Sequence, residues 1–357
     1  MTSFPLASLS RSRLETLIAG FSSLRIVVAG DFFLDRYWEV EPQWEELSVE
    51  TGKPAHQIAA VRSSPGAAGT VAANLAALGV DELHAVGMTG DDGESYELRR
   101  GLACLGCSTD HLHLEPRRRT PTYTKPRDRG RTGLAGEHSR YDIKNRQPTP
   151  EETQSKIIAS LRELIPRADA VVVLDQTETP ECGGVTSAVR ETLAELASEQ
   201  PNVLFWADSR RRIDLFRRLH IKPNQFEALG RDCPAPEETA SIEEVAKAAQ
   251  TLRKQALAPV FVTLGSRGVL VSDPQWTLAP GVPIEGEIDP TGAGDSATAG
   301  CVLALAAGAS CPEAAIVGNL AASITIEQLD TTGTARTEQL LERWKFYQKS
   351  TEPNDAK

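Results

Sequence analysis

The sequence predicts an α/β protein with a doubly wound, mostly parallel β-sheet and a smaller β-sheet that forms a lid. Short apolar runs alternate with helical patterns along most of the 357 residues, which is typical of a doubly wound fold. Each apolar run is continuous rather than alternating with polar residues, as in strands that are covered on both faces. Two further stretches interrupt this rhythm and predict the lid.

The elements of the main body follow from these runs in chain order. The strands are expected at residues 24–31, 82–90, 168–176, 202–210 and 258–273. The helices are expected between and beside them, at residues 69–78, 93–105, 151–165, 184–198 and 242–255.

The lid is expected from two segments that lack the strand–helix rhythm. Residues 36–61 contain Pro42 and Pro54, and residues 110–146 form the larger part of a stretch too long for a simple loop in a compact domain. We expect one domain over residues 1–345, with both lid segments in it, and a polar tail at residues 346–357.

Composition limits the classes of partner. The chain is 40% hydrophobic and 24% charged, as in ordinary globular proteins, and its net charge of −11 argues against nonspecific nucleic-acid binding. It contains no apolar run of the roughly 18–20 residues that span a bilayer and no signal-peptide core, so we expect a cytoplasmic protein without a membrane partner. Cys104 and Cys107 form a lone CxxC, for which buried thiols are a better interpretation than a metal site.

The stretch EIDPTGAGDSATAGCVLALAAG, residues 287–308, is the strongest indication of chemistry. Gly292, Ala293 and Gly294 leave the first N–H groups of the following helix unobstructed, and such groups can surround a phosphoryl group. Asp295 lies in the first turn, where it can accept the proton of an attacking hydroxyl. An acid that merely favours a helix start would explain Asp295 but not the small residues before it.

Several motifs in the right order identify a family resemblance. DPTGAGDSATAG resembles the signature of the ribokinase-like (PfkB) carbohydrate kinases, and VVAGDFFLDRYW, SSPGAAGTVAANLAALGV, IKPNQFEA and VTLGSRGVLV resemble other segments of that family. GDFFLDRYW and RRTPTYTK…SRYD resemble the heptose-7-phosphate kinase subgroup. The resemblance implies an ATP-dependent kinase that phosphorylates a sugar or a sugar phosphate, and a homodimer formed through the lid sheet.

The resemblance also implies roles for individual residues. The sugar is expected at Asp31, Asp35, Gly66, Ala67, Asn74, Lys125 and Arg140. The nucleotide is expected at Asn224, Glu227, Thr263, Gly265, Gly268, Thr291 and Asn319. Asn224 and Glu227 are expected to organise Mg²⁺ mainly through water, and Asp289 with Thr291 is expected to bind a monovalent cation such as K⁺.

Some of these assignments have structural alternatives. The N-x-x-E pattern of Asn224 and Glu227 also fits a helix cap, and the glycines at 265 and 268 also fit a hairpin turn. Asn319 fits a satisfied polar group in a core equally well. The arginine run at 117–119 fits either a grip on a sugar phosphate or a solvated strand edge.

Departures from the family pattern concern the sugar side. Ala67 replaces the second glycine of the glycine-rich turn, Thr70 replaces its first asparagine, and DQTETPECGG at residues 175–184 stands where D-Y-G-K-G is usual. These departures leave the identity of the sugar open. They also keep a second hypothesis open, a catalytically silent regulator that binds a sugar or a nucleotide on the same fold.

Overall fold

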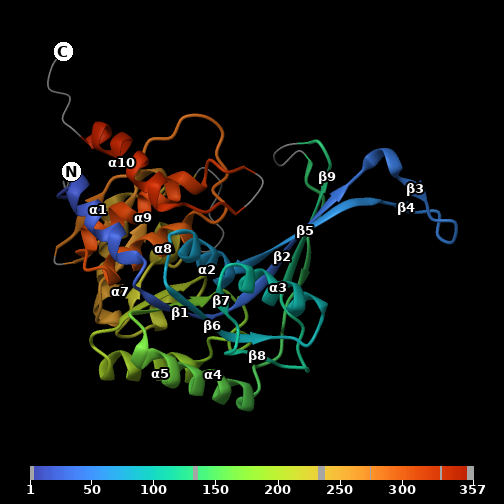
Figure 1. Ribbon diagram of the computed structural model, residues 1–357, viewed down its shortest axis with the longest axis horizontal. Coiled ribbons are helices and arrows are strands. Elements are labelled where there is room, and N and C mark those ends of the chain that lie inside the picture. Colours follow the sequence, from blue (N-terminus) through green and yellow to red (C-terminus); the bar gives the residue numbers. More distant parts are fainter. Residues whose placement is uncertain (1–3, 132–135, 232–237, 274, 330–331, 352–357) are drawn as a thin grey trace.

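A sheet of parallel strands forms the middle layer of the protein (Figure 1). The computed structural model describes residues 4–131, 136–231, 238–273, 275–329 and 332–351. The strands follow the order β13-β12-β11-β1-β6-β7, with β8 also paired to β6, and all of these pairings are parallel. Their bounds are Arg25–Gly30 (β1), Glu82–Thr89 (β6), Cys107–Ser108 (β7), Leu112–Leu114 (β8), Ala170–Asp175 (β11), Leu204–Ser209 (β12) and His220–Ile221 (β13).

Helices cover both faces of this sheet because successive strand residues point to opposite sides. Val28 and Val172 belong to one buried cluster, and their neighbours Val27 and Val171 belong to the other. The first cluster packs against α1 (Arg11–Phe21), α2 (Ala68–Ala77), α3 (Gly93–Cys104), α8 (Ala293–Ala306), α9 (Cys311–Thr325) and α10 (Thr337–Thr351). The second packs against α4 (Glu151–Leu164), α5 (Ser187–Glu199) and α7 (Ile242–Ala256), of which α4 and α5 lie along the lower side in Figure 1. The predicted doubly wound α/β class is therefore confirmed.

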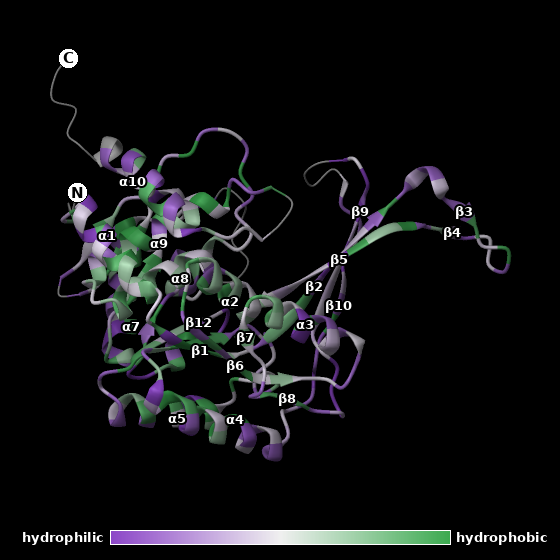
Figure 2. Ribbon diagram, in the orientation of Figure 1, coloured by the Kyte–Doolittle hydropathy of each residue, from purple (hydrophilic) through white to green (hydrophobic). Residues whose placement is uncertain are grey.

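Hydropathy follows the same layering. The central strands and the inner helices α8 and α9 are largely apolar, whereas α4 and α5 carry many hydrophilic residues (Figure 2). Helix α10 continues to Thr351 and buries Tyr347, so ordered helix extends into the segment expected to be a polar tail; residues 352–357 of that segment lie outside the described residues.

One predicted strand of the parallel sheet was wrong. Residues 258–273 form two antiparallel strands, which join a third in a separate sheet: β14 (Phe261–Thr263), β15 (Val269–Val271) and β16 (Thr277–Ala279). The chain reverses at Gly265 and Gly268, whose φ angles of 63° and 98° lie in the left-handed region that glycine adopts readily. The glycines therefore form the turn that the sequence offered as the alternative.

A second, four-stranded sheet stands beside the main body (Figure 1). Its order is β10-β9-β2-β5, with bounds Phe32–Val40 (β2), Ile58–Ala67 (β5), Thr122–Asp128 (β9) and Tyr141–Ile143 (β10). The hairpin of β3 (Glu46–Leu47) and β4 (Pro54–Ala55) extends from it as an arm, on which Trp44, Leu47 and Val49 are exposed. These strands draw on both segments expected to form the lid.

Two expectations from composition concern the rest of the chain. In the part that the structure describes, no helix is both long and apolar enough for a membrane span. Cys107 is buried and Cys104 is exposed, and the described residues contain no group of three or more acids, histidines or cysteines arranged to hold a metal ion.

The backbone at Ala67 generates a stability prediction. Ala67 caps α2 with φ 53° and ψ −117°, a conformation that costs a side chain roughly 1–3 kcal/mol. We expect Ala67→Gly to raise the free energy of unfolding by about 1 kcal/mol, measured by urea denaturation.

The neighbouring substitution Ala68→Gly is the matched control. Ala68 is fully buried in the helix, so its replacement should lower stability by about 1 kcal/mol or more. A loss of stability in Ala67→Gly would contradict the assigned strain.

Candidate active site

A cavity lies at the carboxyl ends of the strands on the β12–β13 side of the sheet. Asp208 is near the end of β12, Lys222 directly follows β13, and Asp295 lies in the first turn of α8. All three line this cavity. Lys222 Nζ is 2.8 Å from Asp208 Oδ2, and both residues are more than nine-tenths buried. The carboxyl edge is where open α/β sheets commonly bind ligands.

The charges in this cavity shift one another's pKa. Burial raises the pKa of Asp295 to about 7, and Asp208 contributes in the same direction while Lys222 and Arg210 oppose it. Burial likewise raises the pKa of Glu227 to about 7, again with Asp208 adding to the effect. Burial alone would lower the pKa of Lys222, but Asp208, Glu227 and Asp295 outweigh it and the net shift is upward. The site thus holds a charged lysine among carboxyl groups that accept protons near neutral pH.

The start of α8 has the open geometry that the sequence predicts. Gly292 caps the helix with φ 80°, Ala293 donates to the carbonyl of Pro290, and the amides of Gly294 and Asp295 find no acceptor among the residues described. A Cβ placed on Gly294 would come 3.5 Å from Lys222 Nζ. Unpaired amides, an ammonium group and the Asp295 carboxyl group therefore belong to residues that line one cavity, an arrangement suited to a phosphoryl group.

Asn224 and Glu227 form a helix cap and also line the cavity. Asn224 Oδ1 accepts the amides of Phe226 and Glu227, and one carboxylate oxygen of Glu227 accepts the amide of Asn224, so the short helix α6 (Gln225–Ala228) begins with a capping box. The cap alternative is therefore correct for their local contacts. Within the part of the chain that the structure describes, the second Glu227 oxygen and the Asn224 side-chain nitrogen have no hydrogen-bond partner, and both residues line the cavity together with Asp208. Oxygen donors with room for water suit Mg²⁺.

Only some of the residues expected to bind nucleotide line the cavity with Asp295. Thr263 lines the same cavity as Asp295, and Gly265 and Gly268 form the turn after β14. Asn319 is buried, and its amide donates to the carbonyls of Ala279 and Pro280 at 3.0 Å each, so its local role is that of a satisfied core group.

The segment expected to hold a monovalent cation precedes α8. Thr291 is exposed, and its amide donates to Asp289 Oδ1 at 2.9 Å. The amide of Asp289 donates to the carbonyl of Ile326. These contacts order the turn that leads into the Gly292 cap.

One face of the lid presents polar groups from neighbouring strands. Lys125 Nζ lies 3.5 Å from Asp35 Oδ1 and 3.3 Å from the Tyr37 hydroxyl. Burial raises the pKa of Asp35, and Lys125 opposes that shift. A Cβ on Gly66 would come 2.8 Å from Asp35 Oδ2, so glycine leaves room for this carboxylate. Arg140 lies at the edge of the lid, where it pairs with Asp142 at 2.7 and 2.9 Å.

Two residues expected to bind the sugar lie in or beside α2. Asn74 is fully buried in α2, where its amide donates to the carbonyls of Thr70 and Gly333. Ala67 lies at the helix cap with the strained backbone described above.

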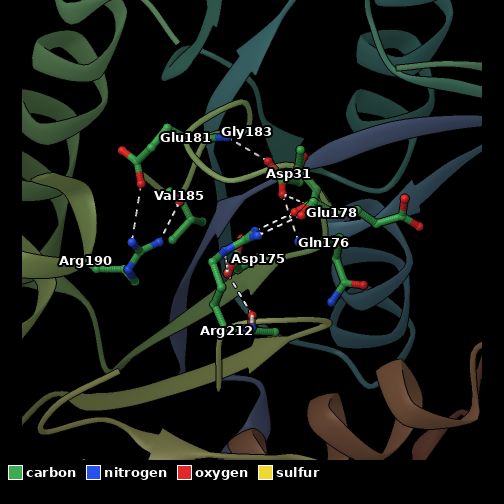
Figure 3. A network of polar contacts seen from close by, with 12 residues as sticks. Asp31, Asp175, Gln176, Glu178, Glu181, Gly183, Val185, Arg190 and Arg212 are labelled. Carbon is green, nitrogen blue, oxygen red and sulfur yellow. Dashed lines mark hydrogen bonds and ion pairs between the residues drawn. The ribbon is translucent and has the colours of Figure 1, made fainter. Parts of the chain in front are cut away.

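Asp31 also has a structural contact pattern, at the junction of the main sheet and the lid (Figure 3). Its Oδ2 accepts the amides of Gln176 and Thr177 at 2.8 and 2.7 Å, and its Oδ1 accepts the amide of Gly184 at 2.7 Å. A Cβ on Gly183 would come 2.4 Å from Asp31 Oδ1. Asp31 thus holds both ends of the loop that replaces D-Y-G-K-G.

Arg212 anchors the same loop from the other side (Figure 3). Its guanidinium makes a two-pronged pair with Asp175 and donates to the carbonyls of Thr177 and Glu178. The Ser209 hydroxyl donates to Asp175 at 2.7 Å. The loop therefore begins at a buried ion pair, whereas residues 178–180 are exposed.

Sequence reasoning missed four charged residues of this region. The missed residues are Asp208, Arg210, Arg212 and Lys222. Charged residues that directly follow a buried apolar run lie at the carboxyl edge of a parallel sheet, and this signal was present in LFWADSRRR and HIKP.

Comparisons with known proteins agree with this fold. The model of the family described as pfkB family carbohydrate kinase matches residues 37–338. A protein of Shewanella amazonensis called Bifunctional protein HldE is 27% identical over 338 residues, which cover 94% of this chain and 66% of that protein. The chain thus spans just under two thirds of that relative's length.

Solved structures show the same architecture. Arabidopsis thaliana ribokinase, complexed with ribose and ATP, superposes with a TM-score of 0.65 at 20% identity, covering 91% of this chain and 99% of that chain. Escherichia coli phosphofructokinase-2, in complex with fructose 6-phosphate, gives 0.65 at 21% identity, covering 92% and 100%.

The matched span is most of the chain, so the protein belongs to the pfkB family of carbohydrate kinases. The family and the ribokinase-like fold expected from the sequence are both confirmed. The solved structures that it resembles include sugar kinases.

The buried pair at the loop generates a stability prediction. Arg212→Met should lower the free energy of unfolding by about 3–5 kcal/mol, because it leaves the Asp175 carboxylate buried without its partner. Denaturant unfolding measures this directly.

Arg211→Met is the matched control, because Arg211 is the exposed neighbour. Its effect should stay within about 0.5 kcal/mol. An equal loss of stability in both variants would show that the pair of Arg212 with Asp175 contributes no more to stability than an exposed arginine does.

Proposed function

We propose that the protein is an ATP-dependent carbohydrate kinase that transfers the γ-phosphoryl group of ATP to a hydroxyl of a sugar or a sugar phosphate. The observation that carries this proposal is the convergence of the Gly294 and Asp295 amides, Lys222 and the Asp295 carboxyl group on one cavity. Family membership supports the same reaction class.

The mechanism assigns the chemistry to these groups. Asp295 accepts the proton of the acceptor hydroxyl as its oxygen forms a bond to the γ-phosphorus, and the bond from that phosphorus to the bridging oxygen breaks to release ADP. The α8 amides and Lys222 stabilise the charge on the transferred group. Mg²⁺, which Asn224 and Glu227 would hold mainly through water, would neutralise charge on the ATP phosphates. A pKa near 7 leaves Asp295 able to accept a proton at neutral pH.

The acceptor and the assembly follow from the same proposal. The acceptor would lie between the lid face at Asp35 and the start of α8, and the resemblance of the lid segments favours heptose 7-phosphate. Trp44, Leu47 and Val49, exposed on the arm, support a homodimer through the lid. A cytoplasmic location and a K⁺ ion at Asp289 and Thr291 belong to this proposal as well.

A kinase assay with a matched variant tests it. We expect Mg²⁺-dependent ADP release with at least one member of a panel of sugars and sugar phosphates, and a turnover about 100- to 10,000-fold lower in Asp295→Asn. ATP affinity, measured by calorimetry, should change little, because the substitution keeps the shape of the site.

Asp81→Asn provides the control, since Asp81 is exposed and lies before β6. Full turnover in Asp295→Asn would remove Asp295 from its role as base. Binding of ATP and a sugar without any ADP release would instead favour the silent regulator.

A further inference from the structure

The end of β12 places Arg210 on the same side of the sheet as Asp208. The Ser209 hydroxyl donates to the Asp175 carboxylate, and the amide of Arg210 donates to the carbonyl of Asp175, so the pairing with β11 continues to this point. Successive residues of a strand point to opposite faces, so Asp208 and Arg210 share the face opposite to Ser209. Trp206, on the same face, belongs to the buried cluster that packs against α8. Arg210 is therefore directed to the side on which α8 begins.

Four cationic residues line the cavity that contains Asp295, and three of them are engaged. The four are Arg210, Arg211, Lys222 and Arg231. Lys222 pairs with Asp208 at 2.8 Å and Arg231 pairs with Glu238 at 3.2 Å, and Arg211 has a partner as well. Among the residues described, the guanidinium of Arg210 makes no hydrogen bond and no ion pair. Its donors are free for a ligand in this cavity.

The charge of Arg210 acts on the site although its side chain is exposed. Burial raises the pKa of Asp295 and of Glu227, and Arg210 opposes both shifts. Burial also raises the pKa of Tyr123 on lid strand β9, and Lys144 and Arg210 oppose that shift. Arg210 therefore lies close enough to influence groups of the main body and of the lid, without forming an ion pair with either.

Arg210 differs from the other donors of the cavity in its freedom to move. Lys222 is more than nine-tenths buried in its pair with Asp208, and the amides at the start of α8 are held by the backbone. An exposed arginine gains little from pairing with a solvated carboxylate, but its fork of donors matches the oxygens of a phosphoryl group. Arg210 is thus the cation of this cavity that can approach such a group after it has bound.

We propose that Arg210 is a further catalytic residue of this site, whose guanidinium binds the oxygens of the γ-phosphoryl group during its transfer from ATP to the acceptor. The inference rests on the proposed function and deepens it, because it adds a mobile donor to the fixed α8 amides and Lys222. Negative charge on the transferred group is spread over its oxygens while the bond to the acceptor oxygen forms and the bond to ADP breaks, so a forked cation stabilises that state.

Steady-state kinetics of full-length variants test the proposal. Arg210→Met should lower kcat about 100- to 1,000-fold, whereas the KM for the acceptor should change little, because the interaction is made mainly in the transition state. Arg210→Lys keeps the charge without the fork and should recover part of the loss. Arg211→Met is the matched control, because Arg211 is the exposed neighbour and lines the same cavity; its kcat should stay near that of the wild-type protein.

A binding measurement provides a readout that needs no turnover. ADP with Mg²⁺ and fluoroaluminate imitates the group in transfer, and Arg210→Met should bind this complex about 100-fold more weakly while its affinity for ADP alone is kept. An unchanged kcat in Arg210→Met, an equal loss of kcat in Arg211→Met, or unchanged affinity for the fluoroaluminate complex would each overturn the proposal.

Stability separates a catalytic role from a structural one. Arg210→Met should unfold at the temperature of the wild-type protein, because the side chain is exposed and unpaired among the described residues. A loss of stability as large as that of Arg212→Met would make Arg210 a structural residue and overturn the proposal. Absence of turnover in the wild-type protein with every acceptor would contradict the proposed function instead, and the fluoroaluminate complex would still decide whether Arg210 binds the phosphoryl group.

Discussion

The ion pair between Lys222 and Asp208 is the interaction on which the candidate site depends. Lys222 is almost completely buried, and an ammonium group in that position stays charged because Asp208, Glu227 and Asp295 surround it. Lys222 in turn opposes the upward pKa shifts of Asp295 and Glu227 that burial and Asp208 produce. The balance leaves Asp295 and Glu227 with pKa values of about 7, close to the range in which a proton can be both accepted and released.

The site also depends on the point at which the chain passes from the main sheet into the lid. Strand β1 ends at Gly30, and β2 begins the lid at Phe32, so Asp31 lies between the two units. Its carboxylate accepts amides from both ends of the loop at residues 176–184, and Gln176 and Glu178 of that loop line the cavity that contains Asp295. One buried acid therefore fixes this wall of the cavity relative to the main sheet.

The sequence predicted most of the fold and part of the site, for reasons that particular residues make clear. Continuous apolar runs located β1, β6, β11 and β12, and the small residues around Gly292 located the start of α8, because these signals are local. Residues 258–273 form two strands because the chain turns at Gly265 and Gly268. The apolar residues on both sides of this turn made the segment resemble one strand. Lys222 is a single charge in its segment and Arg212 is one of three consecutive arginines, and only tertiary packing shows that both are buried and paired with carboxylates. The sequence also does not show the structural contacts of Asp31, because its three amide donors come from a loop about 145 residues away; sugar binding at Asp31 stays a prediction.

Direct titration of the Asp295 carboxyl group tests the central claim that this cluster holds a base near neutrality. Infrared difference spectra between the wild-type protein and Asp295→Asn, recorded across pH, isolate the carboxyl band of this residue. The account predicts that the band of the protonated acid disappears with a midpoint at about pH 7. A midpoint near pH 4, the value of an ordinary aspartate, would contradict it.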